Sequence, residues 1–188
     1  MSDISFEDRT VIVTGAGNGL GKAYAIELGN RGAKVVVNDL GGSVDGSGSG
    51  STPADEVVNE IIANGGEAVA NYDSVATKDG GEAIVQTAID SFGTVDAVIN
   101  NAGILRDKSF AKMTEEELSL IIDVHLKGTF FVSQPAFTVM KEKNYGRIVN
   151  VASPSGLFGN FGQSNYGAAK MGIVGLTMFW QLKVLNTI

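Results

Sequence analysis

The stretch Arg9–Gly21, RTVIVTGAGNGLG, decides the fold because it joins an apolar β-branched run to a glycine-rich turn. The run Arg9–Thr14 predicts a strand that is buried on both faces, as in parallel sheets. The residues KAYAIELGNRG follow and predict a helix that ends near Gly32. Glycines let such a turn approach a pyrophosphate, and the helix N-terminus offers free N–H groups to it. This context favours nucleotide binding over a glycine-rich turn without a ligand.

The rest of the chain alternates apolar runs with helical patterns. Further strands are predicted over Lys34–Asn38, Glu67–Asn71, Val95–Ile99 and Gly146–Ala152. Helices are predicted over Pro53–Asn64, over Lys78–Phe92, from Thr114 onward with a kink or division at Pro135, and from Asn165 to about Leu185. A Gly- and Ser-rich loop separates the second strand from the second helix, over 41–52. The alternation predicts a single α/β domain over residues 1–188, with a parallel sheet covered by helices on both faces.

Composition and charge narrow the classes of protein that fit. The 188 residues suffice for one domain with a hydrophobic core, and 44% hydrophobic with 19% charged residues is typical of soluble globular proteins. Without cysteine and with one histidine, disulfides and thiolate metal sites are excluded, and we expect no metal. A net charge of −7 argues against nucleic-acid and anionic-membrane partners. No apolar run reaches the roughly 18 residues of a membrane span, and no signal peptide is expected.

Two aspartates follow predicted strands. In parallel sheets, ligands bind beyond the carboxyl ends of the strands. Asp39 follows the second strand, where a carboxylate can bind an adenosine ribose and repels a 2′-phosphate. Because no Arg or Lys follows in residues 40–42, we expect NAD rather than NADP, with a turn-forming aspartate as the alternative. Asp73 follows the third strand and can either meet the adenine edge or form a turn.

The sequence NNAG (100–103) follows the fourth strand, at the same predicted edge. Asparagine side chains there can orient a cofactor or stabilise the neighbouring strand. We expect Asn100 to be structural, and Asn101, Ala102 and Gly103 to line the cofactor.

The segment Ser153–Lys170, SPSGLFGNFGQSNYGAAK, carries the candidate chemistry. Tyr166 and Lys170 are four residues apart, so on a helix their side chains lie on one face, one turn apart. A cation at this distance favours the ionised form of a phenol, which can then exchange a proton with an alcohol or carbonyl oxygen. Ser153 follows the predicted fifth strand, where its hydroxyl can hold the same oxygen.

With these motifs the chain resembles the short-chain dehydrogenases/reductases. The resemblance rests on TGAGNGLG (14–21), NNAG, Ser153 and Tyr166 with Lys170, and extends to about Met178. It implies a Rossmann-type doubly wound sheet and hydride transfer between a nicotinamide and a hydroxyl or carbonyl carbon. Tyr166 is then the acid/base, Lys170 promotes its ionisation and holds the nicotinamide ribose, and Ser153 fixes the substrate oxygen. The expected cofactor contacts are Gly15, Asn18, Gly19, Leu20, Gly21, Asp39, Asp73, Asn101, Ala102, Gly103, Tyr166 and Lys170.

A closer resemblance is to the (3R)-hydroxyacyl-CoA dehydrogenase units of type 2 peroxisomal multifunctional enzymes, fungal members in particular. It rests on NDLGGSVDGSGSGSTPADEVV, VANYDSV, NNAGILRDKSF, DVHLKGTF and GLFGNFGQSNYGAAK. It implies oxidation of (3R)-3-hydroxyacyl-CoA to 3-ketoacyl-CoA by NAD in fatty-acid β-oxidation. Such units are fused to a hydratase and, in fungi, joined in tandem, which implies pairing as a homodimer or between tandem units. A peroxisomal location is implied, although the terminal residues 186–188 are not a peroxisomal tripeptide; a cytoplasmic one is the alternative.

His125 stands where most of the family has an asparagine that supports a proton-relay water. The histidine is shared with the multifunctional-enzyme subgroup. Two interpretations are open: a structural histidine within a helix, or a catalytic histidine that relays protons or positions Lys170.

The C-terminal residues depart from the family. Members continue with a sixth strand, a Pro-Gly loop at the nicotinamide, a helical substrate lid and a seventh strand, whereas this sequence ends at Ile188. After Thr177 the usual polar helix end is replaced by MFWQLKVLNTI (178–188), which indicates a truncated or altered product that lacks the last strands and the lid. We expect an unpaired or partly exposed edge on the fifth strand, and weak NAD binding and slow turnover by the isolated chain.

Two other functions are compatible with these motifs. One is a 3-oxoacyl-carrier-protein reductase or a generic carbonyl reductase, which the Gly/Ser loop and Asp39 disfavour. The other is an inactive nucleotide-binding or dimerising fragment. In this family the helix over 114–142 and the catalytic helix usually pair between subunits.

Overall fold

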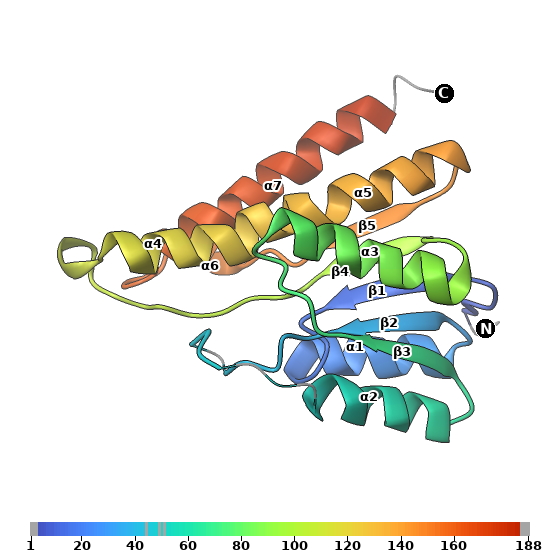
Figure 1. Ribbon diagram of the computed structural model, residues 1–188. Helices are drawn as coiled ribbons and strands as arrows, with labels where there is room; N and C mark the ends of the chain where they lie inside the picture. The colour runs from blue at the N-terminus through green and yellow to red at the C-terminus, as the bar shows by residue number, and fades with distance from the viewer. Residues whose placement is uncertain (1–3, 44, 49, 51, 185–188) are drawn as a thin grey trace.

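The computed structural model describes residues 4–43, 45–48, 50 and 52–184. Five parallel strands form one sheet in the order β3-β2-β1-β4-β5 (Figure 1). The strands are β1 (Thr10–Thr14), β2 (Lys34–Asn38), β3 (Glu67–Asn71), β4 (Ala97–Asn100) and β5 (Arg147–Asn150). The chain winds outward from β1 to β3 and then returns to β4 on the other side of β1. This order confirms the predicted doubly wound, Rossmann-type α/β fold.

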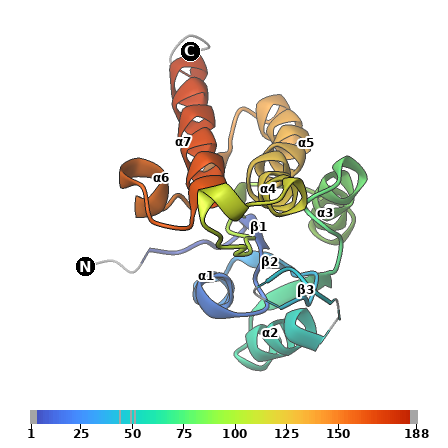
Figure 2. The same cartoon turned by 90° about the vertical axis from the view of Figure 1, so that its left-hand side faces the viewer.

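Helices cover both faces of the sheet. In Figure 2, α1 (Gly19–Asn30) and α2 (Thr52–Ala63) lie on one face, and α3 (Lys78–Phe92), α5 (Gly128–Glu142) and α7 (Ser164–Val184) lie on the other. Successive strand residues point to opposite faces. Val11 and Val13 of β1 therefore pack in the core beneath α1 and α2, whereas Ile12 packs in the core beneath α3 and α5.

Several predicted boundaries agree with the structure. β2, β3 and α3 begin and end where the sequence predicts. α3 has local signals at both ends, because the Thr77 side chain accepts a hydrogen bond from the Gly80 N–H and Gly93 ends the helix with φ +78°. α1 begins at Gly19, inside the glycine-rich turn, rather than after it. The predicted end of the last helix, Leu185, lies outside the described residues.

The helical region after NNAG is divided at a different place from the one predicted. The capping box expected between Thr114 and Glu117 is present at the start of α4 (Glu115–Ile121). A π-helix, η2 (Ile122–Lys127), then separates α4 from α5. Pro135 lies inside α5, so the helical region is not divided at this proline, and the alternative of a kink there stays a prediction.

Pro135 lacks an N–H, so the Phe131 carbonyl four residues earlier receives no helical hydrogen bond from it. That carbonyl lies against α3: a Cβ added to Gly81 would be 2.4 Å from the Phe131 oxygen. The absence of a side chain at Gly81 thus permits the close contact between α3 and α5.

Two short elements were not predicted from the sequence: the 3₁₀ helix η1 (Phe110–Lys112) and α6 (Pro154–Phe158). Ser153 is the N-cap of α6, and Pro154 occupies its first turn, a position that tolerates proline.

β5 forms one edge of the sheet. Within the described part of the chain it pairs only with β4, and Val149 is 51% exposed. The expected exposed edge is therefore confirmed for these residues. None of the described helices has the length and apolar character needed to cross a membrane.

Candidate active site

The carboxyl ends of the strands meet at one edge of the sheet, where amide side chains join neighbouring strands. The Asn38 side chain donates a 2.8 Å hydrogen bond to Asn71, and the Asn100 side chain donates one of 2.8 Å to Asn150. Asn100 also donates to the Ser133 hydroxyl, at 2.9 Å. The structural role expected for Asn100 is thus confirmed.

The residues after β4 hold the glycine-rich turn in place through hydrogen bonds. The Asn101 side-chain nitrogen donates to the carbonyls of Thr14 and Gly15, at 3.0 Å each. In return, the Thr14 hydroxyl accepts from the N–H groups of Asn101 and Ala102. Gly15 has φ +61°, and an added Cβ would be 2.7 Å from the Ala102 Cα. Asn101 and Ala102 therefore brace the turn, and Thr14 is a partner that the sequence reasoning missed.

The other side of the turn is open. Asn18, Gly19 and Leu20 are exposed, and the Asn18 side chain makes no capping hydrogen bond. A Cβ added to Gly19 would meet nothing within 4 Å, whereas Gly21 is closely packed against the Gly15 carbonyl. The first N–H groups of α1 have no acceptor within the helix. This uncapped helix start fits the pyrophosphate of a dinucleotide.

Asp39 joins the glycine-rich turn to the loop after β2. Its Oδ2 accepts from the Gly17 N–H and its Oδ1 from the Gly41 N–H, both at 2.7 Å. The turn-forming alternative is therefore present in the structure. A carboxylate has about four acceptor positions, so these bonds leave acceptors for ribose hydroxyls.

Asp73 is exposed and forms a local turn. Its Oδ2 accepts from the Asn71 side chain at 2.8 Å, and its N–H donates to the Asn71 oxygen at 3.0 Å. These contacts correspond to the turn-forming alternative, and a contact with adenine stays a prediction.

The described part of the Gly/Ser loop reaches across the same edge (Figure 1). Gly46 lies beside Ile104: an added Cβ would be 2.8 Å from the Ile104 Cδ1. The loop closes on itself where the Gly50 N–H donates to the Leu40 carbonyl at 2.9 Å. The loop thus extends from the end of β2 to the segment after β4, past the end of β1, which lies between these two strands.

Three of the predicted catalytic residues lie together. The rings of His125 and Tyr166 are 5.1 Å apart and nearly perpendicular, and the Lys170 Nζ is 5.6 Å from the centre of the Tyr166 ring. Lys170 is 4% exposed and donates a 2.6 Å hydrogen bond to the Val151 carbonyl. Burial lowers the pKa of Lys170 to about 8, so the side chain is largely charged at pH 7.

His125 is 2% exposed and lies in the π-helix η2. Its Nε2 lies 2.8 Å from the Ile104 carbonyl oxygen and 3.1 Å from the Ile104 nitrogen. Burial, followed by the Lys170 charge, lowers the pKa of His125 to about 4, against the opposing effect of the Ile104 hydrogen bond. The ring is therefore neutral at pH 7. A Cβ on Gly103 would be 2.4 Å from the ring, so Gly103 makes room for it.

Ser153, the fourth predicted catalytic residue, caps α6. Its hydroxyl accepts from the Ser155 N–H at 3.2 Å, as an N-cap. α6 packs on α7, and a Cβ added to Gly156 would be 2.9 Å from the Lys170 Cβ. In the described residues, no group of three or more His, Asp or Glu side chains could hold a metal ion.

Comparisons with known proteins identify the family of the chain. The family model described as short chain dehydrogenase matches residues 9–187. Over 174 residues the chain is 62% identical to the peroxisomal hydratase-dehydrogenase-epimerase of Saccharomyces cerevisiae, a match that covers 93% of this chain and 19% of that protein.

Two solved structures are similar. A short chain dehydrogenase from Mycobacterium avium has 47% identity and a TM-score of 0.84, over 91% of this chain and 61% of that one. The full-length peroxisomal multifunctional enzyme type 2 from Drosophila melanogaster has 46% identity and a TM-score of 0.76, over 92% of this chain and 27% of that one. The chain thus spans only part of each of these relatives. On its fold, its motifs and the family match, the chain belongs to the short-chain dehydrogenases.

Proposed function

We propose that the chain is an NAD-dependent dehydrogenase unit that oxidises (3R)-3-hydroxyacyl-CoA to 3-ketoacyl-CoA in fatty-acid β-oxidation. The observation that carries the reaction type is the contact of Tyr166 with Lys170 and His125, at the sheet edge that also holds the glycine-rich turn. The names of the yeast and fruit-fly relatives support a peroxisomal location, and the yeast name supports a dehydrogenase. The acyl-CoA substrate class rests on the resemblance to (3R)-hydroxyacyl-CoA dehydrogenase units.

The chain's own residues supply the proton chemistry. When bound, NAD⁺ would accept the hydride from C3 of the substrate. Tyr166 takes the proton of the C3 hydroxyl, so that the hydroxyl becomes a carbonyl and the proton passes on to solvent. Lys170 places a positive charge 5.6 Å from the centre of the Tyr166 ring. Ser153 donates a hydrogen bond to the substrate oxygen.

Asp39 supports NAD over NADP. Its carboxylate lies between the glycine-rich turn and the loop after β2, where it would repel a 2′-phosphate. Calorimetric titration of the chain should give a Kd for NAD at least about tenfold below that for NADP, and Asp39→Ser should narrow this difference. Equal affinity of the unmodified chain for the two cofactors would contradict the assignment.

The substrate is tested with the two epimers of a 3-hydroxyacyl-CoA, at several acyl chain lengths, by following NADH formation. The (3R) epimer should react, and Tyr166→Phe should lower the rate by about 100-fold or more. A preference for NADPH and a 3-ketoacyl carrier protein would support the reductase alternative instead. Binding of NAD without turnover of either epimer would support the nucleotide-binding fragment.

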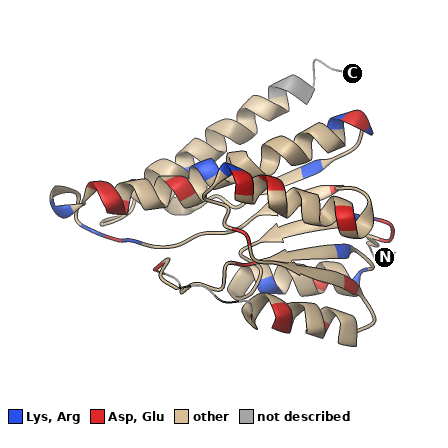
Figure 3. Ribbon diagram, viewed as in Figure 1, with Lys and Arg blue, Asp and Glu red and all other residues tan. Residues whose placement is uncertain are grey.

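We also propose that the unit pairs with a second short-chain dehydrogenase unit through α5 and α7. Phe130 and Phe137 of α5 and Met171 and Met178 of α7 are large apolar side chains that remain exposed. α7 carries few charged residues along its length (Figure 3). Large apolar side chains that are exposed in the isolated chain would be covered at such an interface.

A further inference from the structure

We propose that Asn165 is a positioning residue that fixes Tyr166 at the start of α7. Asn165 directly precedes Tyr166 and is completely buried. The catalytic meaning of this proposal rests on the proposed role of Tyr166 as the acid/base. The geometric part of the proposal does not depend on that role.

Both ends of the Asn165 amide are hydrogen-bonded. Its Nδ2 donates to the carbonyls of Arg106 and Glu117, at 3.1 Å each. Its Oδ1 accepts from the N–H of Tyr166, at 2.8 Å. An asparagine amide has two N–H donors and one acceptor oxygen, so both donors are in use. One buried side chain thus joins Tyr166 to two other segments of the chain.

Tyr166 needs such a partner because of its place in the helix. It lies in the first turn of α7, where N–H groups have no acceptor within the helix. Four residues earlier, the Gly162 carbonyl accepts from the Lys108 N–H at 2.8 Å. Asn165 therefore supplies the acceptor for the Tyr166 N–H. Without it, a partly buried amide group would lose its hydrogen bond.

The segments that hold Asn165 are themselves fixed. The coil after β4 is bound at Ile104 by the His125 side chain, and at Asp107 by the Gln163 side chain at 2.9 Å. Glu117 lies in the capped first turn of α4. Asn165 thus connects the Tyr166 backbone to a frame that is held at several points. His125, which packs edge-on against the Tyr166 ring, belongs to the same frame.

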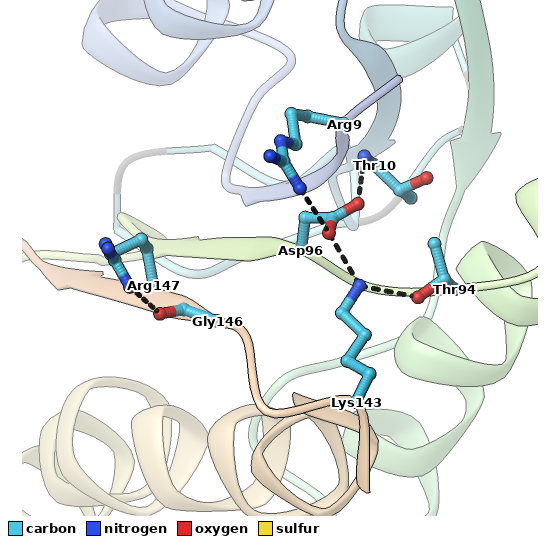
Figure 4. A network of polar contacts seen from close by, with 7 residues as sticks. All are labelled: Arg9, Thr10, Thr94, Asp96, Lys143, Gly146 and Arg147. Atoms are coloured by element: carbon cyan, nitrogen blue, oxygen red, sulfur yellow. Dashed lines mark hydrogen bonds and ion pairs between the residues drawn. The ribbon is translucent and has the colours of Figure 1, made fainter. Parts of the chain in front are cut away.

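The test is Asn165→Ala, which removes all three hydrogen bonds without adding charge. A matched control is Asp96→Asn, at the amino ends of the strands and therefore at the other end of the sheet from the candidate active site. Asp96 is also buried, and its carboxylate accepts from the Thr10 N–H at 2.8 Å and from the Lys143 Nζ at 2.6 Å (Figure 4). Asn165→Ser, which keeps a short acceptor and one donor, serves as the milder variant if Asn165→Ala does not fold.

The first readout is the ¹³C resonance of the tyrosine rings in protein labelled on its four tyrosines. Asn165→Ala or Asn165→Ser should shift the Tyr166 signal and leave the Tyr145 signal in place. Asp96→Asn should do the reverse, because Tyr145 packs against Arg9 and Lys143 beside Asp96. This readout needs neither cofactor nor substrate. An unshifted Tyr166 signal in a folded Asn165 variant overturns the proposal.

The second readout is turnover of the (3R)-hydroxyacyl-CoA. Asn165→Ala should lower kcat by about 100-fold, the loss typical of a catalytic group displaced by about 1 Å. It should change the Kd for NAD much less, because most of the expected cofactor contacts lie outside α7. Asp96→Asn should leave kcat per folded molecule unchanged. If Tyr166→Phe is inactive but the Asn165 variants turn over normally, the positioning role of Asn165 is overturned while the proposed function stands. If Tyr166→Phe is as active as the unmodified chain, the proposed function fails.

Discussion

At the scale of single residues, Lys170 combines a functional benefit with a cost in stability. Burial lowers its pKa from 10.5 to about 8, so the folded state binds this proton less tightly than the unfolded state. Below pH 8 the buried charge therefore costs on the order of 3 kcal/mol relative to the neutral amine. The hydrogen bond to the Val151 carbonyl is the compensating contact.

Lys170→Met should therefore abolish turnover without destabilising the fold. Methionine occupies a similar volume and removes the buried charge, which raises stability. The loss of the hydrogen bond to Val151 lowers stability and offsets part of this gain. We expect a free energy of unfolding at pH 7 within about 1 kcal/mol of the unmodified chain, or above it. Urea titration and NADH formation measure the two quantities. A fall of several kcal/mol would show that Lys170 is mainly structural.

His125 makes stability depend on pH. Its pKa is about 4 in the folded state against 6.5 ordinarily, so between these values the unfolded state binds more protons. The stability that the neutral His125 contributes is fully present above pH 6.5 and is lost as the pH falls toward 4. From pH 7 to pH 5 the free energy of unfolding should drop by about 2 kcal/mol on this account. His125→Asn should remove this part of the slope in urea titrations at the two pH values. An unchanged slope would assign the pH dependence to other groups.

The sequence predicted which residues lie at the site better than it predicted their partners. Tyr166, Lys170 and His125 do lie together. The amide of Asn101 binds carbonyls of the glycine-rich turn, a contact that the sequence does not predict, and its expected role in lining the cofactor stays a prediction. Asn165 was not singled out at all, because its value lies in contacts with residues 48 and 59 positions away. Such contacts depend on tertiary packing and leave no local pattern.

At the scale of elements, local signals explain what the sequence could predict. α3 has a threonine cap and a left-handed glycine at its ends, and its boundaries were predicted. The π-helix η2 was missed because its hydrogen-bond pattern has no signature in residue propensity. In the structure it holds His125 against Ile104, a long-range contact. Pro135, the strongest local signal for a break, lies within α5 instead.

A substitution of Gly81 tests the packing of α3 against α5. Gly81→Ala should destabilise the chain by about 1–3 kcal/mol, because the new methyl would lie 2.4 Å from the Phe131 carbonyl oxygen and the backbone would have to move. Gly175→Ala, in α7, is the matched control: an added Cβ there meets nothing within 4 Å. It should stabilise by about 0.5–1 kcal/mol, the ordinary gain of alanine over glycine in a helix. Thermal unfolding compares the two, and equal effects would contradict the close contact.

At the scale of the whole molecule, the two edges of the sheet have different roles. At the amino ends of the strands, Asp96 joins Thr10, Arg9 and Lys143, far in sequence but close in space (Figure 4). At the carboxyl ends, loops and helix starts form the candidate active site. The contacts of Asp96 join segments at the amino ends of the strands, whereas the carboxyl ends supply open backbone groups and charged side chains. The exposed apolar residues of α5 and α7 belong neither to the Asp96 contacts nor to the candidate active site.

Those exposed apolar residues lead to a prediction about association. If the apolar side chains of α5 and α7 form an interface, the purified chain should sediment as a dimer, and its melting temperature should rise with protein concentration. Phe137→Glu and Met171→Glu, at positions 38% and 51% exposed, should give monomers because each would place a charge in the interface. Ile62→Glu on α2 is the matched control, since Ile62 is 54% exposed on the opposite face of the sheet and should leave the dimer intact. A monomeric unmodified chain at micromolar concentration, or equal effects of all three substitutions, would exclude pairing through these helices.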